Sequence, residues 1–108
     1  MSSEKYAVRY EKPAPKIIPY EDSSFTSGDT GVTHAPFTDL GRKEHAYNGE
    51  IDCDGAGDIT IQLSNDGTTF DTAITVKAAE TLETTGYELH SFKVNHTGTD
   101  SAYRSRFW

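Results

Sequence analysis

The sequence has almost no cysteine and no long run of hydrophobic residues. Cys53 is the only cysteine among 108 residues, so no disulfide can form within the chain, and a small scaffold held by several bridges is excluded. The opening Met-Ser-Ser-Glu-Lys is not followed by an apolar segment, and no stretch is apolar enough to cross a bilayer. We therefore expect the chain to stay in the cytoplasm where it is made, without a membrane partner.

Hydrophobic and basic residues are both scarce. Hydrophobic residues make up 34% of the chain and the mean hydropathy is -0.65, which predicts a thin core with a large aromatic share. The 17 acidic residues outnumber the 10 basic ones, for a net charge of -7, and the lysines and arginines are spread along the chain. Such a surface repels phosphates. At this length we expect one domain and no nucleic-acid partner.

Motifs that carry catalysis are missing as well. The sequence has no Gly-x-Ser-x-Gly element for a nucleophile and no glycine-rich phosphate loop. Pairs of carboxylates occur, but in so acidic a chain they arise by chance. We expect neither enzymatic activity nor a cofactor.

One acidic loop is a weak candidate for a cation site. Asp52, Asp54 and Asp58 alternate with Gly55 and Gly57, and calcium prefers such oxygen ligands. Counted from Asp52, the third and sixth positions fit a calcium-binding EF-hand loop, whereas the fifth and twelfth do not. The alternative, which we favour, is a solvated pair of turns in which the two glycines supply left-handed φ angles. We therefore expect no bound metal.

The sequence has enough histidines, four, for a zinc site, but none of them has the spacing of a ligand motif. We expect them to lie on the surface or in an interface: His34, His45, His90 and His96.

From residue 37 onward, short apolar alternations separated by turn residues predict an antiparallel β-sandwich, either jelly-roll or immunoglobulin-like. The clearest case is Ile59, Ile61 and Leu63, which share one face of a strand. Asn65-Asp66-Gly67 follows as a hairpin turn. The expected strands are 46–53, 58–64, 73–77, 87–96 and 102–108.

Two segments interrupt this pattern. Leu89 is out of phase with Phe92 and Val94, and a β-bulge around His90 and Ser91 is the simplest explanation. Residues 77–83 are the best helical candidate, although we interpret them as a loop with at most one turn.

Residues 1–36 contain all four prolines and a cluster of Ser, Thr, Gly and Asp. Proline removes a ladder donor and biases the preceding residue toward extended backbone, so this segment is predicted to be an arm or loop and not a central strand. The aromatics in and beside this segment, among them Phe25 and the adjoining Phe37, have little core of their own to join and suit an interface. The alternative left open is that the arm folds back on its own sandwich. The expected contact residues are Tyr6, Val8, Tyr10, Ile17, Ile18 and Tyr20.

Residues 57–70 (GDITIQLSNDGTTF) and 97–104 (TGTDSAYR) resemble small β-sandwich virion proteins of tailed bacteriophages, over about the last two-thirds of the chain. The resemblance implies a virion component that decorates or cements the head shell as an oligomer, with an N-terminal arm that reaches onto neighbours. The hairpin at 64–70 is also similar to one in carbohydrate-binding sandwiches, where a Trp often replaces Phe70.

These observations predict a sandwich domain at 37–108 and an arm at 1–36. The leading hypothesis is a capsid decoration or cement protein, assembled in the host cytoplasm, whose arm binds the major capsid protein or other virion subunits by strand addition and which forms a homo-oligomer, with a trimer favoured. The alternatives are a tail or neck component and a carbohydrate-binding module that uses exposed aromatics such as Tyr47, Tyr87, Tyr103 or Trp108.

Overall fold

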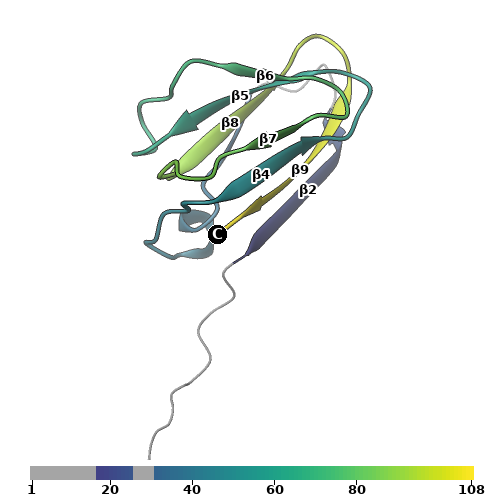
Figure 1. Cartoon of the computed structure of the whole chain (residues 1–108). Helices are drawn as coiled ribbons and strands as arrows, with labels where there is room; N and C mark the ends of the chain where they lie inside the picture. Colours follow the sequence, from purple (N-terminus) through teal and green to yellow (C-terminus); the bar gives the residue numbers. More distant parts are fainter. Residues whose placement is uncertain (1–16, 26–30) are drawn as a thin grey trace, which may run out of the picture.

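The computed structural model describes residues 17–25 and 31–108 and shows a sandwich of two four-stranded sheets (Figure 1). All strand pairs are antiparallel. The first sheet has the order β2 (Ile18–Phe25), β9 (Ser101–Phe107), β4 (Gly49–Cys53) and β7 (Thr81–Glu83). The second has the order β3 (Val32–His34), β8 (Ser91–His96), β5 (Ile59–Ser64) and β6 (Ile74–Val76). A short 3-10 helix, η1 (Thr38–Leu40), lies between β3 and β4.

The order of strand pairing identifies the sandwich as a jelly roll. The first described strand pairs with the last, β2 with β9, and the next pairs are β3 with β8, β4 with β7 and β5 with β6. The chain is thus one long antiparallel ribbon, and the additional pairs β4–β9 and β5–β8 close it into two sheets. Of the two sandwich types expected from the sequence, the strand order selects this one over the immunoglobulin arrangement.

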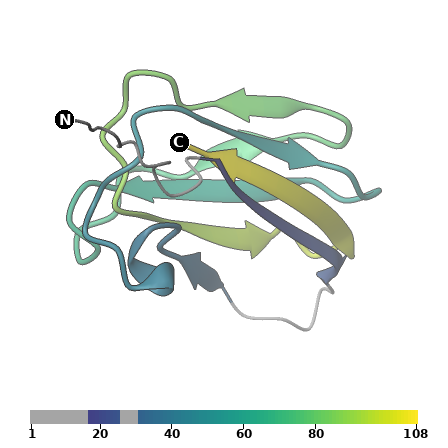
Figure 2. The ribbon, with the colours of Figure 1, turned by 90° about the horizontal axis from the view of Figure 1, so that it is seen from below.

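The core lies between the two sheets and depends on residues that alternate along each strand. In β5 the side chains of Ile59, Ile61 and Leu63 are buried, as the sequence predicts. From the facing sheet, Phe107 of β9 meets Phe92 of β8 with 5.0 Å between ring centroids. β2 and β9 run side by side in one layer (Figure 2), and the C-terminus lies beside the start of β2 (Figure 1).

The five strands expected from the alternation are confirmed, four with shorter bounds and the last shifted by one residue, but two local predictions are wrong. Residues 77–83 are not only a loop or helical turn, because their last three residues form β7. This strand pairs with β4, with Leu82 opposite Ile51. No bulge explains the phase of Leu89. It pairs with Ala46 in an isolated bridge, and β8 begins only at Ser91. The change of phase thus lies before the regular strand begins.

The second half of the expected arm belongs to the sandwich. β2 pairs with β9 and β3 pairs with β8, so each of these strands has a main-chain partner within its own molecule on one side, contrary to the expectation that all of 1–36 needs a neighbour. Both strands lie at sheet edges, where Pro19 costs no internal hydrogen bond. Phe37 is buried in the core. Residues 1–16 and 26–30 are outside the part of the chain that the structure describes.

The glycines of the acidic loop serve close packing and not turns. Gly67 has a φ of 85°, as expected of the hairpin, and the backbone amides of Thr69 and Thr68 lower the pKa of Asp66 beside it. Gly55 and Gly57, in contrast, do not have positive φ angles, which corrects the expected turns. A Cβ on Gly55 would lie 2.4 Å from the backbone nitrogen of Ala102, so glycine is required there by the neighbouring strand.

Ala79 allows a test of the backbone in the turn before β7. Its φ of 71° is the one positive value among the non-glycine residues that the structure describes, and the left-handed region costs an L-residue roughly 1–2 kcal/mol. Replacement Ala79→Gly should raise the free energy of unfolding in urea by about 0.5 kcal/mol, after the greater chain entropy of glycine is offset. The neighbouring control Ala78→Gly should lower it by about 0.5–1 kcal/mol; destabilisation by both changes would contradict the assignment of strain.

Candidate functional site

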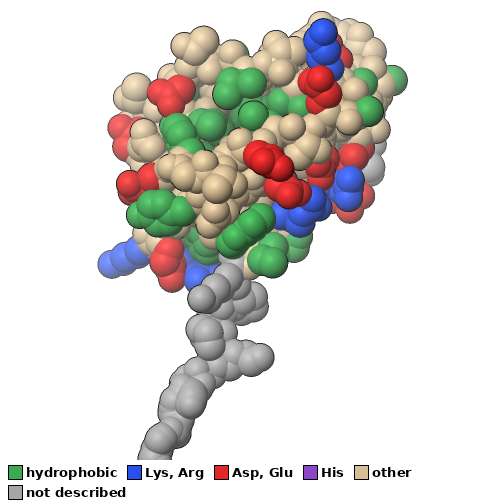
Figure 3. Space-filling model, viewed as in Figure 1, with side chains coloured by type: hydrophobic (Ala, Val, Ile, Leu, Met, Phe, Trp, Pro, Cys, Tyr) green, Lys and Arg blue, Asp and Glu red, His purple; other side chains and the backbone are tan. Residues whose placement is uncertain are grey.

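Exposed hydrophobic side chains gather at the end of the sandwich where β2 begins. We call this surface the apolar end, and define it by Ile17, Tyr20, Leu40, Tyr47 and Trp108. Their exposed fractions range from 39% for Trp108 to 59% for Leu40. Ile18 lies opposite Phe107 in the sheet, and the amides of Tyr47 and Asn48 both donate to the carbonyl of Trp108, which joins these segments at one place. Hydrophobic side chains are visible there at the lower end of the body (Figure 3).

A hollow of about 160 Å³ opens between the two edge strands at this end. Its apolar wall includes Ile18, Pro36, Leu40 and Phe92, and Asp39 lies at its margin. The ring of Tyr20 lies over it, 42% exposed. A pocket of this kind accepts apolar side chains and excludes charged ones.

His34 of β3 holds the two edge strands together above the hollow. Its ring lies 4.3 Å from that of Tyr20 and its Nε2 is 2.7 Å from the hydroxyl oxygen of the buried Tyr103. Of the histidines expected on a surface or in an interface, this one is half-buried and bridges the sheets.

The residues expected to make arm contacts separate into three groups. Ile17 and Tyr20 are exposed in the apolar end, whereas Ile18 is half-buried against the core of its own molecule. The other three, Tyr6, Val8 and Tyr10, lie outside the described residues. The sequence did not single out Leu40, because a lone leucine between Asp39 and Gly41 has no apolar period to mark it.

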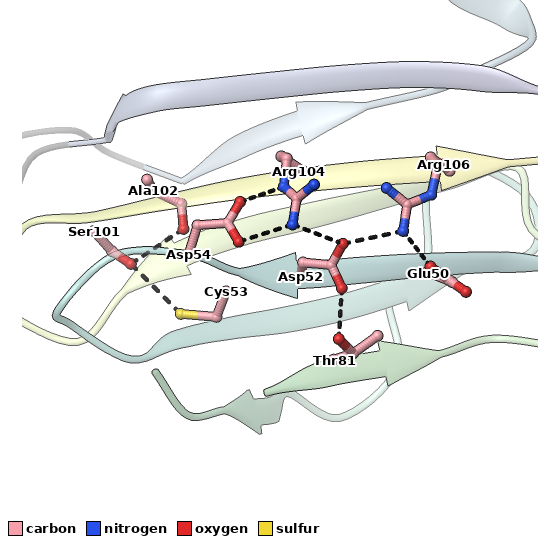
Figure 4. Close-up of polar contacts among 9 residues, drawn as sticks. All are labelled: Glu50, Asp52, Cys53, Asp54, Thr81, Ser101, Ala102, Arg104 and Arg106. Carbon is pink, nitrogen blue, oxygen red and sulfur yellow. Dashed lines mark hydrogen bonds and ion pairs between the residues drawn. The ribbon is translucent and has the colours of Figure 1, made fainter. Parts of the chain in front are cut away.

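The outer face of the first sheet carries a ladder of alternating charge (Figure 4). Arg104 donates to Asp54 at 2.6 and 3.2 Å, and its guanidinium lies 3.6 Å from Asp52. Arg106 donates to Asp52 at 3.2 Å and to Glu50. The hydrogen bond with Asp54 raises the pKa of Arg104, and that with Glu50 raises the pKa of Arg106. The three carboxylates of this ladder outnumber its two guanidinium groups, so the ladder leaves no basic surface.

The ladder engages two of the three carboxylates that were considered as a weak cation site. Asp52 and Asp54 face the two arginines, while Asp58 accepts a hydrogen bond from the amide of Ala78 at 3.0 Å. Within residues 17–25 and 31–108, no group of three or more His, Cys, Asp or Glu is placed to hold a metal ion. The spacing Glu-x-Asp at 50–52 against Arg-x-Arg at 104–106 was the available signal, since alternate residues of paired strands share a face.

The other three histidines each have local partners. His45 lies 2.8 Å from Glu88, and its ring meets that of His90 edge-on at 5.3 Å. His90 also contacts Thr38 at 3.3 Å. His96 accepts a hydrogen bond from the amide of Gly98.

The four aromatics considered for sugar stacking differ in exposure. Tyr103 is fully buried and thus cannot meet a ligand. Tyr87 is half-buried and donates to Asp71 at 2.6 Å; burial and that carboxylate raise the pKa of Tyr87 to about 12. Tyr47 and Trp108 remain exposed, and both belong to the apolar end.

The ladder makes a prediction about stability. The carboxylate of Asp52 is nearly buried, accepts a hydrogen bond from Thr81 and forms ion pairs with Arg104 and Arg106. The change Asp52→Asn should therefore lower the free energy of unfolding by about 1–2 kcal/mol. The change Asp54→Asn, at a more exposed member of the same ladder, should cost less than about 1 kcal/mol. Urea unfolding of the two variants measures both, and an equal or greater loss for Asp54→Asn would contradict the central place of Asp52.

No protein-family model, curated protein or solved structure matches this chain. No helix in the described part is long and apolar enough to span a membrane. The function is therefore argued from the geometry of the apolar end and the charges around it.

Proposed function

We propose that the chain is a non-enzymatic structural subunit of a virus particle, a head decoration or cement protein of the tailed-bacteriophage kind. It would bind the shell and its own copies through the apolar end and the N-terminal segment that enters the fold there. The observation that carries this proposal is that the exposed hydrophobic side chains gather where the chain enters β2. Large exposed apolar patches on small proteins mark interaction surfaces.

The fold supports this proposal without deciding it. Jelly rolls are common among viral capsid domains, and also among lectins, so fold alone does not carry function. The acidic surface, whose two ladder arginines are already paired with carboxylates, favours a protein partner over a nucleic acid. The apolar end, in turn, supplies the contact area.

The mechanism would be the addition of many small contacts on a symmetric shell. Covering a half-exposed leucine or tyrosine yields about 1 kcal/mol, so one apolar end alone binds weakly. Copies that also bind each other attach together, and the effective concentration of each further contact is high. Decoration by this route stabilises the shell because every bound copy spans adjacent subunits.

Removal of residues 1–16 tests the role of the N-terminal segment. A chain that begins at Ile17 keeps β2 and β3 and should stay folded, but should lose attachment to particles in a sedimentation assay. A chain that begins at Phe37 is a poor test, because it lacks the strands that pair with β9 and β8. Circular dichroism and cooperative unfolding of the shorter chain provide the control; unchanged attachment would overturn the role of the segment.

A tail or neck position in the same particle is compatible with the same surfaces. Electron cryomicroscopy of particles assembled with and without the chain locates the added density and separates these positions from the head.

A second candidate function is carbohydrate binding, which the exposure of Tyr47 and Trp108 at one end favours. If sugars stack there, Tyr47→Ala and Trp108→Ala should each weaken glycan binding at least about tenfold, as expected for stacked aromatic anchors. Tyr87→Ala is the matched control, since that ring is held by Asp71. Isothermal titration after a glycan-array screen measures the effect, and a blank array with tight binding to particles would exclude this candidate.

A further inference from the structure

Among residues 17–25 and 31–108 no strand pairs with β2 on the side away from β9, and we call this side its free edge. This edge has an apolar inner side and an acidic outer side. On the inner side, Tyr20 lies beside the hollow between the edge strands. On the outer side, Glu21 is exposed and lies directly opposite Arg104 of β9. The hydrogen bonds of Arg104 run the other way, to Asp54 of the ladder. The carboxylate of Glu21 is thus the last charge before the edge.

Charges alternate across this sheet along the row that contains Glu21. The row passes from Glu21 to Arg104 and then to Asp52, that is, from negative to positive to negative. Opposite charges on neighbouring strands stabilise a sheet, whereas like charges oppose pairing. A strand added beside β2 would continue the alternation if it placed a cation next to Glu21.

The first sixteen residues have the composition that such a strand requires. They hold four of the ten basic residues and two of the 17 acidic ones, a net charge of +2, which leaves -9 on residues 17–108. Within them Tyr6, Val8 and Tyr10 alternate with Lys5 and Arg9. In an extended strand these two sets point to opposite faces.

We propose that residues 5–10 of a second copy of this chain add as a strand along the free edge of β2. If Arg9 lies opposite Glu21, then Val8 and Tyr10 fall on the inner face with Tyr20, over the hollow. One register therefore satisfies both the charge and the apolar surface. In this contact the partner is a second copy of the chain and the acceptor is the edge of β2. Its biological setting rests on the proposed structural role.

A neighbouring copy is a better donor than the same molecule. Lys12 and Ala14 each precede a proline, which biases both toward extended backbone and opposes a tight reversal onto the adjacent β2. The eight residue-to-residue steps from Tyr10 to Ile18 can instead span about 25 Å. Direct pairing of two β2 strands is disfavoured, because it would place the Glu21 carboxylates of both copies on one edge without a cation between them.

Sedimentation velocity of the full-length chain over a range of concentrations tests this contact. The chain should associate reversibly, and Val8→Asp, which places a carboxylate over the hollow, should abolish association. Arg9→Gln and Glu21→Gln should each weaken it roughly threefold to fivefold, as for an exposed ion pair. The double variant should be no weaker than either single one, because the two residues act on each other. Glu83→Gln, on the opposite edge strand β7 of the same sheet, is the matched control and should leave association unchanged.

A chain that stays monomeric at every concentration, or additive losses in the double variant, would overturn the contact. These outcomes are distinguishable from failure of the proposed function. If residues 1–16 are needed for attachment to particles while the isolated chain is monomeric, the segment binds another subunit and the strand exchange is wrong. If the chain associates as described but does not attach to particles, the strand exchange is supported and the proposed virion role is wrong.

Discussion

The pairing of β9 with both β2 and β4 is the interaction on which the rest of the molecule depends. β9 is the last strand of the chain, and it is buried between one of the first strands and a central one. Its alternation places Tyr103 and Phe107 in the core and Arg104 and Arg106 on the outer face. Because its partners lie fifty or more residues away in sequence, the sheet forms only when distant parts of the chain meet, which is typical of slow-folding β topologies.

The core strands were predictable because burial on one face leaves a period of two in the sequence. Ile59, Ile61 and Leu63 carry that signal, and the structure confirms it. The short strand β7 was not predictable, because Thr81 and Glu83 are exposed and only Leu82 faces inward. Three residues of this kind have no period to detect, and the strand exists because β4 lies beside it. Tertiary pairing decides such segments, and local propensity does not.

The N-terminal part shows the same limit in a different form. Pro19 argued against a strand, since proline cannot donate to a ladder, but the rule applies to central strands, and β2 is at an edge. The position of a strand within its sheet is a property of the whole fold and cannot be inferred from the residues around the proline. For the candidate site, the sequence indicated Ile17 and Tyr20. It could not indicate Leu40, which joins them only because η1 brings it to the edge of the sandwich.

A long edge strand exposes unpaired main-chain groups, and proteins usually protect such an edge with charge, proline or a cover. β2 has both Pro19, which lacks a main-chain donor, and Glu21, whose carboxylate opposes pairing with strands of like charge. The carboxylate does not oppose a basic strand. The same carboxylate that keeps two β2 edges apart attracts Arg9 of another copy, so the edge is selective and not merely blocked. This selectivity is the physical reason to expect ordered assembly from a protein whose residues 17–108 carry a net charge of -9, where unselective edges would produce aggregates.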